Sequence, residues 1–129
     1  MITNSPLIPS VKPTLDAIVA LARDLVQADV VTIHLYDSRT STFNLYSGVG
    51  AGREFGTPRK EGTSSYIVER GRPVITNNTL KHPQFRDNPF TRSRNVRSAA
   101  GFPLLVDDTV SGVLYINYHK PRQLTRARV

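Results

Sequence analysis

The chain has 129 residues, of which 39% are hydrophobic and 21% are charged, and its formal net charge is +7. These values are typical of a single folded domain with a hydrophobic core. The absence of cysteine excludes disulfides, thiolate metal sites and cysteine nucleophiles. No apolar run approaches the roughly 20 residues of a membrane-spanning helix, and the N-terminus lacks the basic start and apolar stretch of a secretory signal. We therefore expect a cytoplasmic protein.

The N-terminal part of the sequence predicts a helix followed by a β-hairpin. Residues 1–13 contain several prolines and predict an irregular lead-in. Residues 14–26 place apolar side chains at i, i+3, i+4 and i+7, which predicts an amphipathic helix. Residues 30–36 alternate apolar and polar side chains, and after a polar turn residues 43–47 predict a second strand. The two strands form the predicted hairpin.

A glycine-rich loop and a short helix follow. We expect a short edge strand near residues 54–58 within this loop. Residues 63–70 predict the helix, because Thr63 or Ser64 can cap its first turn and Gly71 can end it in the left-handed conformation.

The C-terminal part predicts three more strands around one long connection. Residues 73–76 predict a strand, and residues 77–96 form a polar connection of a length that is usually functional. Residues 98–106 and 109–118 predict two strands joined by the turn-prone pair Asp107-Asp108. We expect an α+β fold: a central antiparallel sheet of five to six strands, with an N-terminal helix on one face and a layer of loops and one short helix on the other.

Several short motifs, in this order and spacing, resemble the GAF domain, a small-molecule sensory module of signalling proteins. They are Gly-Arg-Pro-Val at 71–74, Phe-Pro-Leu at 102–104 and Gly-Val-Leu at 112–114. His-Pro-Gln-Phe at 82–85 is similar to the Asp-Pro-x-Phe turn of the family, with histidine at the acidic position. We expect a GAF domain over residues 14–125.

The resemblance also implies a C-terminal helix beyond this region. We expect residues 126–129 to be the truncated start of that helix. Its absence would leave apolar surface on the first helix and the sheet, which favours a homodimer. The resemblance further implies that an output domain accompanies the sensory domain in the full-length protein.

In nucleotide-binding GAF domains the ligand lies between one sheet face and the covering layer of loops and helix. The alternation of the first and last strands independently places one polar set of side chains on a shared face, opposite an apolar set that includes Val31, Ile33 and Leu114. The start of the short helix offers amides to an anionic group, and an arginine of the covering segment suits a carboxylate or a phosphate. The ligand-binding residues that we expect from the resemblance and the alternation are Thr32, His34, Tyr46, Ser47, Thr63, Ser64, Phe85, Arg92, Val96 and Tyr115.

Two interpretations of this layer remain open at the level of the sequence. Tyr46, Phe85 and Tyr115 can line an open pocket, because aromatic rings with a few hydroxyls are the usual composition of a small-molecule site. Equally, these rings can fill a closed core. Arg92 either pairs with the ligand or belongs to a solvated basic loop.

The residues narrow the ligand chemistry without identifying the ligand. The cyclic-nucleotide motif of the family is not met, since Asn117 lies one residue early and the acidic pair would fall beyond Val129. Covalent bilin attachment and methionine sulfoxide reduction need cysteines, which are absent. Haem needs an axial ligand such as His34, but a lone strand histidine is more often structural. No residues have zinc-site spacing, and we leave the cofactor unknown.

The sequence favours a regulatory domain over an enzyme. No serine lies in a nucleophile-elbow motif, and the close carboxylates Asp107 and Asp108 lie on a predicted turn. The sequence disfavours nucleic acid as a partner, because no aromatic residues interleave the basic segment. We expect a non-catalytic sensory domain that relays ligand occupancy through its terminal helices. The alternative is a ligand-free dimerisation or docking module, and the alternative fold is a PAS domain.

Overall fold

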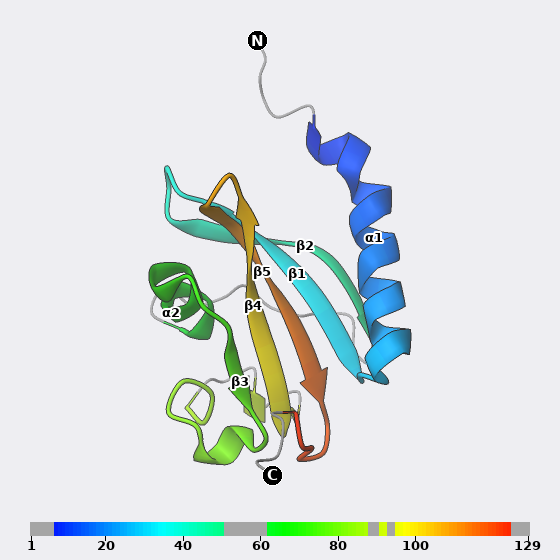
Figure 1. Ribbon diagram of the computed structural model, residues 1–129, viewed down its shortest axis with the longest axis vertical. Helices are drawn as coiled ribbons and strands as arrows, with labels where there is room; N and C mark the ends of the chain where they lie inside the picture. The colour runs from blue at the N-terminus through cyan, green and yellow to red at the C-terminus, as the bar shows by residue number, and fades with distance from the viewer. Residues whose placement is uncertain (1–6, 51–61, 88–90, 93–94, 125–129) are drawn as a thin grey trace.

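The computed structural model of the chain describes residues 7–50, 62–87, 91–92 and 95–124 (Figure 1). Among these residues no helix is both long and apolar enough to span a membrane. In chain order the elements are α1 (Leu7–Val26), β1 (Val30–Asp37), β2 (Thr42–Gly50), α2 (Thr63–Arg70), β3 (Val74–Thr76), the 3-10 helix η1 (Thr79–Lys81), β4 (Ser98–Val106) and β5 (Thr109–Tyr118).

The described strands form one sheet in the order β2-β1-β5-β4-β3, and every neighbouring pair is antiparallel. α1 and α2 lie on opposite sides of this sheet (Figure 1). The α+β fold, the antiparallel sheet and the N-terminal helix on one face are therefore confirmed. The edge strand expected near residues 54–58 lies outside the described residues.

The first helix begins at Leu7, so the prediction of an irregular lead-in is wrong from residue 7 onward. Pro9 lies in the first turn, where main-chain amides have no acceptor within the helix and proline costs little. Pro13 lies inside the helix and removes one further amide donor. Because of these two prolines, the sequence predicted a helix that begins only at Thr14, which is an interior residue of α1.

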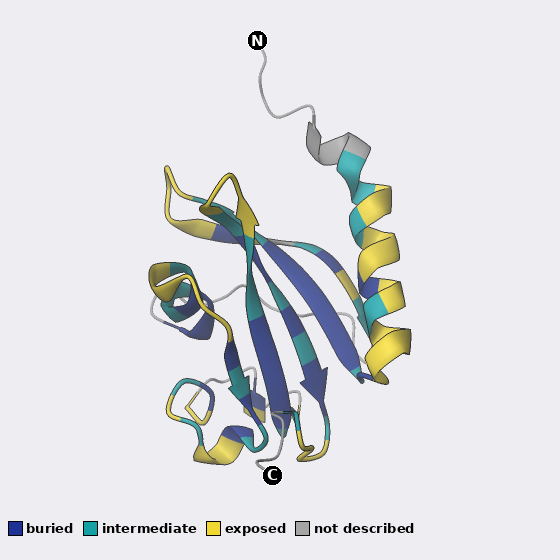
Figure 2. Ribbon diagram, viewed as in Figure 1, coloured by how far each residue is buried: buried dark blue, intermediate teal, exposed yellow. Residues whose placement is uncertain are grey.

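Each sheet face packs a separate core. Val31 and Ile33 of β1 pack toward Val19 of α1, together with Ala28 and Tyr118. The opposite face carries a second cluster beneath α2: Phe43, Ile67, Val74, Phe85, Val96, Ala99, Val113 and Tyr115. Figure 2 shows that the central strands are buried over much of their length, whereas most of α1 is exposed. The predicted alternation along β1 and β5 is confirmed.

The caps of α2 correct one prediction and confirm another. Gly62 is the N-cap residue, and no side chain caps the helix. Thr63 and Ser64 lie inside the helix, where their hydroxyls bond to Gln84 and Tyr115 instead. Gly71 ends the helix in the left-handed conformation, with φ 66°, and its amide donates to the Ile67 carbonyl at 2.7 Å.

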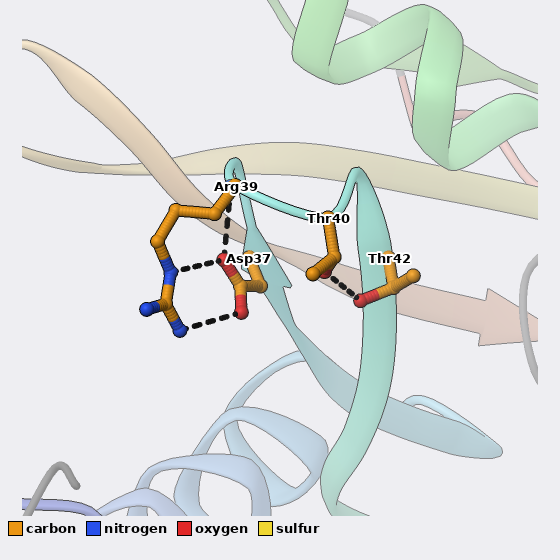
Figure 3. A network of polar contacts seen from close by, with 4 residues as sticks. All are labelled: Asp37, Arg39, Thr40 and Thr42. Carbon is orange, nitrogen blue, oxygen red and sulfur yellow. Dashed lines mark hydrogen bonds and ion pairs between the residues drawn. The ribbon is translucent and has the colours of Figure 1, made fainter.

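Tight turns close both hairpins at one end of the sheet. Asp107 and Asp108 adopt positive φ values of 51° and 67°, as a two-residue hairpin turn requires. In the β1–β2 turn, the Arg39 guanidinium and main-chain amide donate to the Asp37 carboxylate (Figure 3). These hydrogen bonds lower the pKa of Asp37, and the hydroxyls of Thr40 and Thr42 lie 2.6 Å apart beside them.

Candidate ligand site

The candidate site is built on two adjacent strands, β1 and β5. Thr32 of β1 lies opposite Tyr115 of β5 in the antiparallel register, and His34 lies opposite Val113. Because side chains two residues apart share a strand face, Thr32 and His34 both point to the α2 side. The ring of His34 meets that of Tyr115 edge-on, with centroids 6.1 Å apart and planes inclined at 80°.

The helix α2 closes over this strand pair. The hydroxyl oxygens of Ser64 and Tyr115 are 2.6 Å apart and form a buried hydrogen bond. Gly101 of β4 lies opposite Tyr115, and a Cβ atom at this glycine would come within 2.6 Å of Ile67 Cδ1 and 2.7 Å of Tyr115 Cε1. The glycine therefore leaves room for the side chains of Ile67 and Tyr115 to pack against the main chain of β4.

The described side chains at the centre of the site are polar but carry no permanent charge. Thr32, His34, Ser64 and Tyr115 are buried, with exposed fractions of 2%, 5%, 3% and 9%. Burial raises the pKa of Tyr115 more strongly than its bond to Ser64 lowers it, so the phenol stays protonated. Both imidazole nitrogens of His34 are buried as well. The hydroxyls and the imidazole can donate hydrogen bonds to a small molecule and accept them from it, and the two rings can contact its apolar surface.

The segment between β3 and β4 is anchored to α2. Thr63 donates its hydroxyl to the main-chain oxygen of Gln84. The main-chain amide of Gln84 donates to Nδ1 of His82 at 3.1 Å. Partial burial lowers the pKa of His82. Phe85 is buried and meets the His82 ring at 5.4 Å. The His-Pro-Gln-Phe turn therefore lies at the N-terminus of α2.

Val96 is buried in the same cluster at the C-terminal end of this segment. Its main-chain oxygen accepts a hydrogen bond from the hydroxyl of the buried Thr79 at 2.7 Å. The structure thus brings Thr32, His34, Thr63, Ser64, Phe85, Val96 and Tyr115 to one side of the sheet.

Two expected residues instead contact α1. Ile33 pairs with Ser47 whereas His34 pairs with Leu45, so Tyr46 is an extra residue in a β-bulge. The Ser47 hydroxyl donates to Asp16 of α1 at 2.6 Å. Lys12 Nζ donates to the main-chain oxygen of Tyr46 at 2.8 Å and lies 5.4 Å from the ring centroid. Both residues were expected from the resemblance, and the bulge was not predicted.

Arg92 also lies apart from the buried cluster. Its side chain is 69% exposed. The guanidinium donates through Nε to the main-chain oxygen of Arg86 at 3.2 Å and lies 4.0 Å from the Asp87 carboxylate. These contacts stay within the covering segment.

Sequence reasoning did not include three residues of this region in the site. Asn117 is 4% exposed and follows Tyr115 on the same face of β5; the strand alternation was the signal for it. Gly101 is isolated inside a strand, a pattern that marks close approach of a neighbour, and Ile67 was visible only as an apolar helix residue. No group of His, Asp or Glu side chains within the described ranges can hold a metal ion.

Comparisons with known proteins agree with this architecture. The family model of the GAF domain matches residues 10–129. The GAF domain of an Acinetobacter phosphoenolpyruvate-protein phosphotransferase is 24% identical, with a TM-score of 0.75 over 89% of this chain and 70% of that one. No curated protein sequence matches the chain.

Two further solved structures share the fold. Staphylococcus aureus NreA, mutated in its nitrate binding site, is 19% identical, with a TM-score of 0.73 over 89% of this chain and 90% of that one. The free methionine-R-sulfoxide reductase of Neisseria meningitidis, in complex with its substrate, is 20% identical, with a TM-score of 0.72 over 92% of this chain and 74% of that one. The match of the family model over nearly the whole length shows that this chain belongs to the GAF domain family.

Proposed function

We propose that this GAF domain is the non-catalytic sensory domain of a cytoplasmic signal-transduction protein. It binds a small molecule between the β1–β5 face and the layer formed by α2 and the following segment. The observation that carries the proposal is the buried polar set Thr32, His34, Ser64 and Tyr115, which lies between these two layers.

The chemistry of this set indicates what kind of molecule it suits. Polar groups cost free energy to bury unless they are hydrogen-bonded, so packing alone would favour apolar side chains at Thr32 and His34, like Val31 and Ile33 on the α1 side. Hydroxyls and an imidazole beside aromatic rings suit a small molecule with both polar edges and a flat apolar surface. The first-turn amides of α2 add donors for an acceptor group.

The solved relatives support a small-molecule role without transferring a ligand. By their descriptions, NreA has a nitrate binding site and the methionine sulfoxide reductase binds its substrate, so this fold accommodates small molecules. The present chain contains no cysteine, and the thiol chemistry that the resemblance implies for reductases of this fold has no nucleophile here. We therefore propose binding rather than catalysis.

The packing of β1 offers a route from the site to α1. Thr32 and His34 point to the site, while Ile33 between them packs on the α1 side and pairs with Ser47. Ser47 in turn bonds to Asp16 of α1. A ligand that displaced β1 would also shift these contacts, and it would bias α1 if it bound one arrangement better than the other.

A second candidate function is a ligand-free dimerisation or docking module. Its support is an apolar stripe on the outer face of α1, where Ile18, Leu21 and Leu25 are 41%, 59% and 73% exposed. Apolar stripes of this kind mark contact surfaces, and a homodimer through α1 is compatible with either function. If the domain is a docking module, the side chains of Tyr115 and Ile67 only fill the core next to Gly101.

A thermal-shift screen with matched variants separates the two functions. Small polar and aromatic molecules are screened for a rise in the melting temperature of the wild-type chain. Hits are repeated on Thr32→Val and Tyr115→Phe, with Ser47→Ala, which faces α1, as the control. We expect hits that are weakened by the first two changes and retained by the control. Hits that all three variants retain equally would contradict the proposed site, and a screen without hits would favour the docking module.

A further inference from the structure

The described charged side chains are unevenly distributed between the two ends of the sheet. The end that holds the β1–β2 and β4–β5 turns carries Asp37, Asp107 and Asp108, with Arg39 paired to Asp37. The opposite end holds η1, the segment before β4 and the segment after β5 (Figure 1). We call this opposite end the basic end, and its cations are Lys81, Arg86, Arg92, Arg97, Lys120 and Arg122.

Two hydrogen bonds and one ring contact bring three of these cations to neighbouring positions. The Arg97 amide donates to the Tyr118 carbonyl at 2.8 Å, and the Ser98 hydroxyl donates to the Lys120 carbonyl at 2.7 Å. The Arg122 guanidinium lies 4.5 Å from the centre of the Tyr118 ring. These contacts place Arg97, Lys120 and Arg122 close together at this end of the sheet.

The 3-10 helix η1 adjoins this group. The Thr79 amide donates to the Arg97 carbonyl at 2.8 Å, and the same helix carries Lys81 and Leu80. Leu80 is 49% exposed. An apolar side chain is thus available to a partner beside the cations.

Few carboxylates neutralise the basic end. Asp87 lies 3.7 Å from Arg86 and 4.0 Å from Arg92, and all three side chains are exposed. Asp29 accepts a hydrogen bond from the His119 amide. Within the described part of the chain, Lys81, Arg97, Lys120 and Arg122 form no ion pair. An uncompensated group of cations attracts anionic partners and speeds their association.

The surroundings of the cations favour carboxylates over nucleic acid. Single-stranded nucleic acid is bound by base stacking on exposed rings. The described tyrosine and phenylalanine rings at this end, Tyr118 and Phe85, are only 4% and 3% exposed. The half-buried rings of His82 and His119 contact Phe85 and the main-chain oxygen of Asn95. Arginine forks match carboxylates in a bidentate geometry, and Leu80 offers an apolar contact that a phosphate backbone would not use.

We propose that the basic end docks an acidic, leucine-containing segment of a partner protein. Carboxylates of the segment pair with Arg97, Lys120 and Arg122, and its leucine side chain contacts Leu80. The surface is separate from the buried candidate site, so docking and ligand binding can occur on the same molecule.

Fluorescence anisotropy with a labelled synthetic peptide of Glu, Asp and Leu residues tests this proposal on the whole chain at low ionic strength. The key variant is Lys120→Glu/Arg122→Glu. Its matched control is Arg70→Glu/Arg72→Glu, because the net charge changes equally and Arg70 also lies over a tyrosine ring, that of Tyr66 at 5.0 Å. We expect the key variant to weaken binding about tenfold or more, and the control by less than about twofold. Leu80→Ser should weaken binding about threefold.

Three results would overturn the proposal. Equal weakening by both charge reversals would show a response to net charge alone. Tighter binding of a duplex DNA of equal charge would assign the surface to nucleic acid, and no binding of the peptide would leave it without a carboxylate partner. If the double variant has a lowered melting temperature, the single variant Lys120→Glu replaces it, because Lys120 is exposed. Its peptide affinity is then compared with that of Arg72→Glu.

Discussion

The two faces of the central sheet differ in chemistry although the same strands supply both. On β1, Val31 and Ile33 pack toward α1 in an aliphatic core, whereas Thr32 and His34 lie on the α2 side with Tyr115. Both faces gain free energy from the burial of apolar side chains, since each carries an apolar cluster. Thr32 and His34 gain less, because each buried polar group must recover the hydrogen bonds that it gave to water. The difference makes Thr32 and His34, which apolar packing does not require, the side chains of β1 to test for ligand binding.

The largest expected effect comes from emptying the α1 face. Ile33 is 1% exposed, and Ile33→Ala should lower the free energy of unfolding by about 2–5 kcal/mol through lost burial and a residual cavity. Its neighbour on the opposite face provides the control, since Thr32→Val should change the free energy by about 1 kcal/mol or less. Urea unfolding measures both variants. Equal losses would remove the energetic distinction between the apolar and the polar side chains of β1.

A smaller effect is expected from filling the close contact on the α2 face. Gly101→Ala should cost about 1–3 kcal/mol, because the new Cβ meets Ile67 and Tyr115. Adding Ile67→Val removes the Cδ1 atom that the Cβ would approach. In a double-mutant cycle by urea unfolding, the paired variant should lose less than the sum of the single losses. Strict additivity would show that Ile67 does not lie on Gly101 in solution.

The Ser64–Tyr115 hydrogen bond should contribute about 1 kcal/mol. Ser64→Ala and Tyr115→Phe should each cost roughly this amount, and the double variant little more than either, because both changes remove one shared bond. Thermal unfolding of the four proteins in the cycle checks this expectation. Losses that simply add would indicate that the two hydroxyls have other partners.

The smallest effect concerns the polar contact between α1 and β2. Hydrogen bonds from Lys12 and then Ser47 lower the pKa of Asp16 from its ordinary value of 3.8. A lowered pKa in the folded state stabilises the protein above pH 3.8, and this contribution disappears as pH falls through the folded-state pKa. The stability difference between wild type and Asp16→Asn should therefore shrink in acid.

An NMR titration of the Asp16 carboxyl group gives an independent readout. Ser47→Ala should raise its pKa toward the ordinary value, while Thr42→Ala, elsewhere on β2, should leave it unchanged. An Asp16 pKa that is the same in wild type and Ser47→Ala would show that the contact does not persist in solution.

The features that the sequence predicted well depend on local patterns. The alternation along residues 30–36 and 109–118 is set by strand geometry, so the face of Thr32 and Tyr115 was predictable. Gly71 could be placed as a helix end because its left-handed conformation favours glycine.

The features that the sequence did not predict depend on contacts between distant segments. The bulge at Tyr46 arises from the pairing of β1 with β2, and a shift of one residue moves a side chain to the opposite face. Ser47 therefore contacts Asp16 of α1. The sequence did not predict that α1 begins at Leu7, because prolines usually indicate the end of a helix, whereas the first turn of a helix tolerates them. The ligand-binding roles of the expected residues stay predictions.

The most direct test of the central claim, that the α2 face binds a small molecule, is a native mass spectrum of the freshly purified chain beside Tyr115→Phe. We predict that the wild-type chain carries extra mass that leaves on gentle activation, and that the variant retains less of it. A wild-type spectrum at the bare chain mass, as monomer or dimer, with Tyr115→Phe indistinguishable from it, would contradict the account and favour a docking module with a filled core.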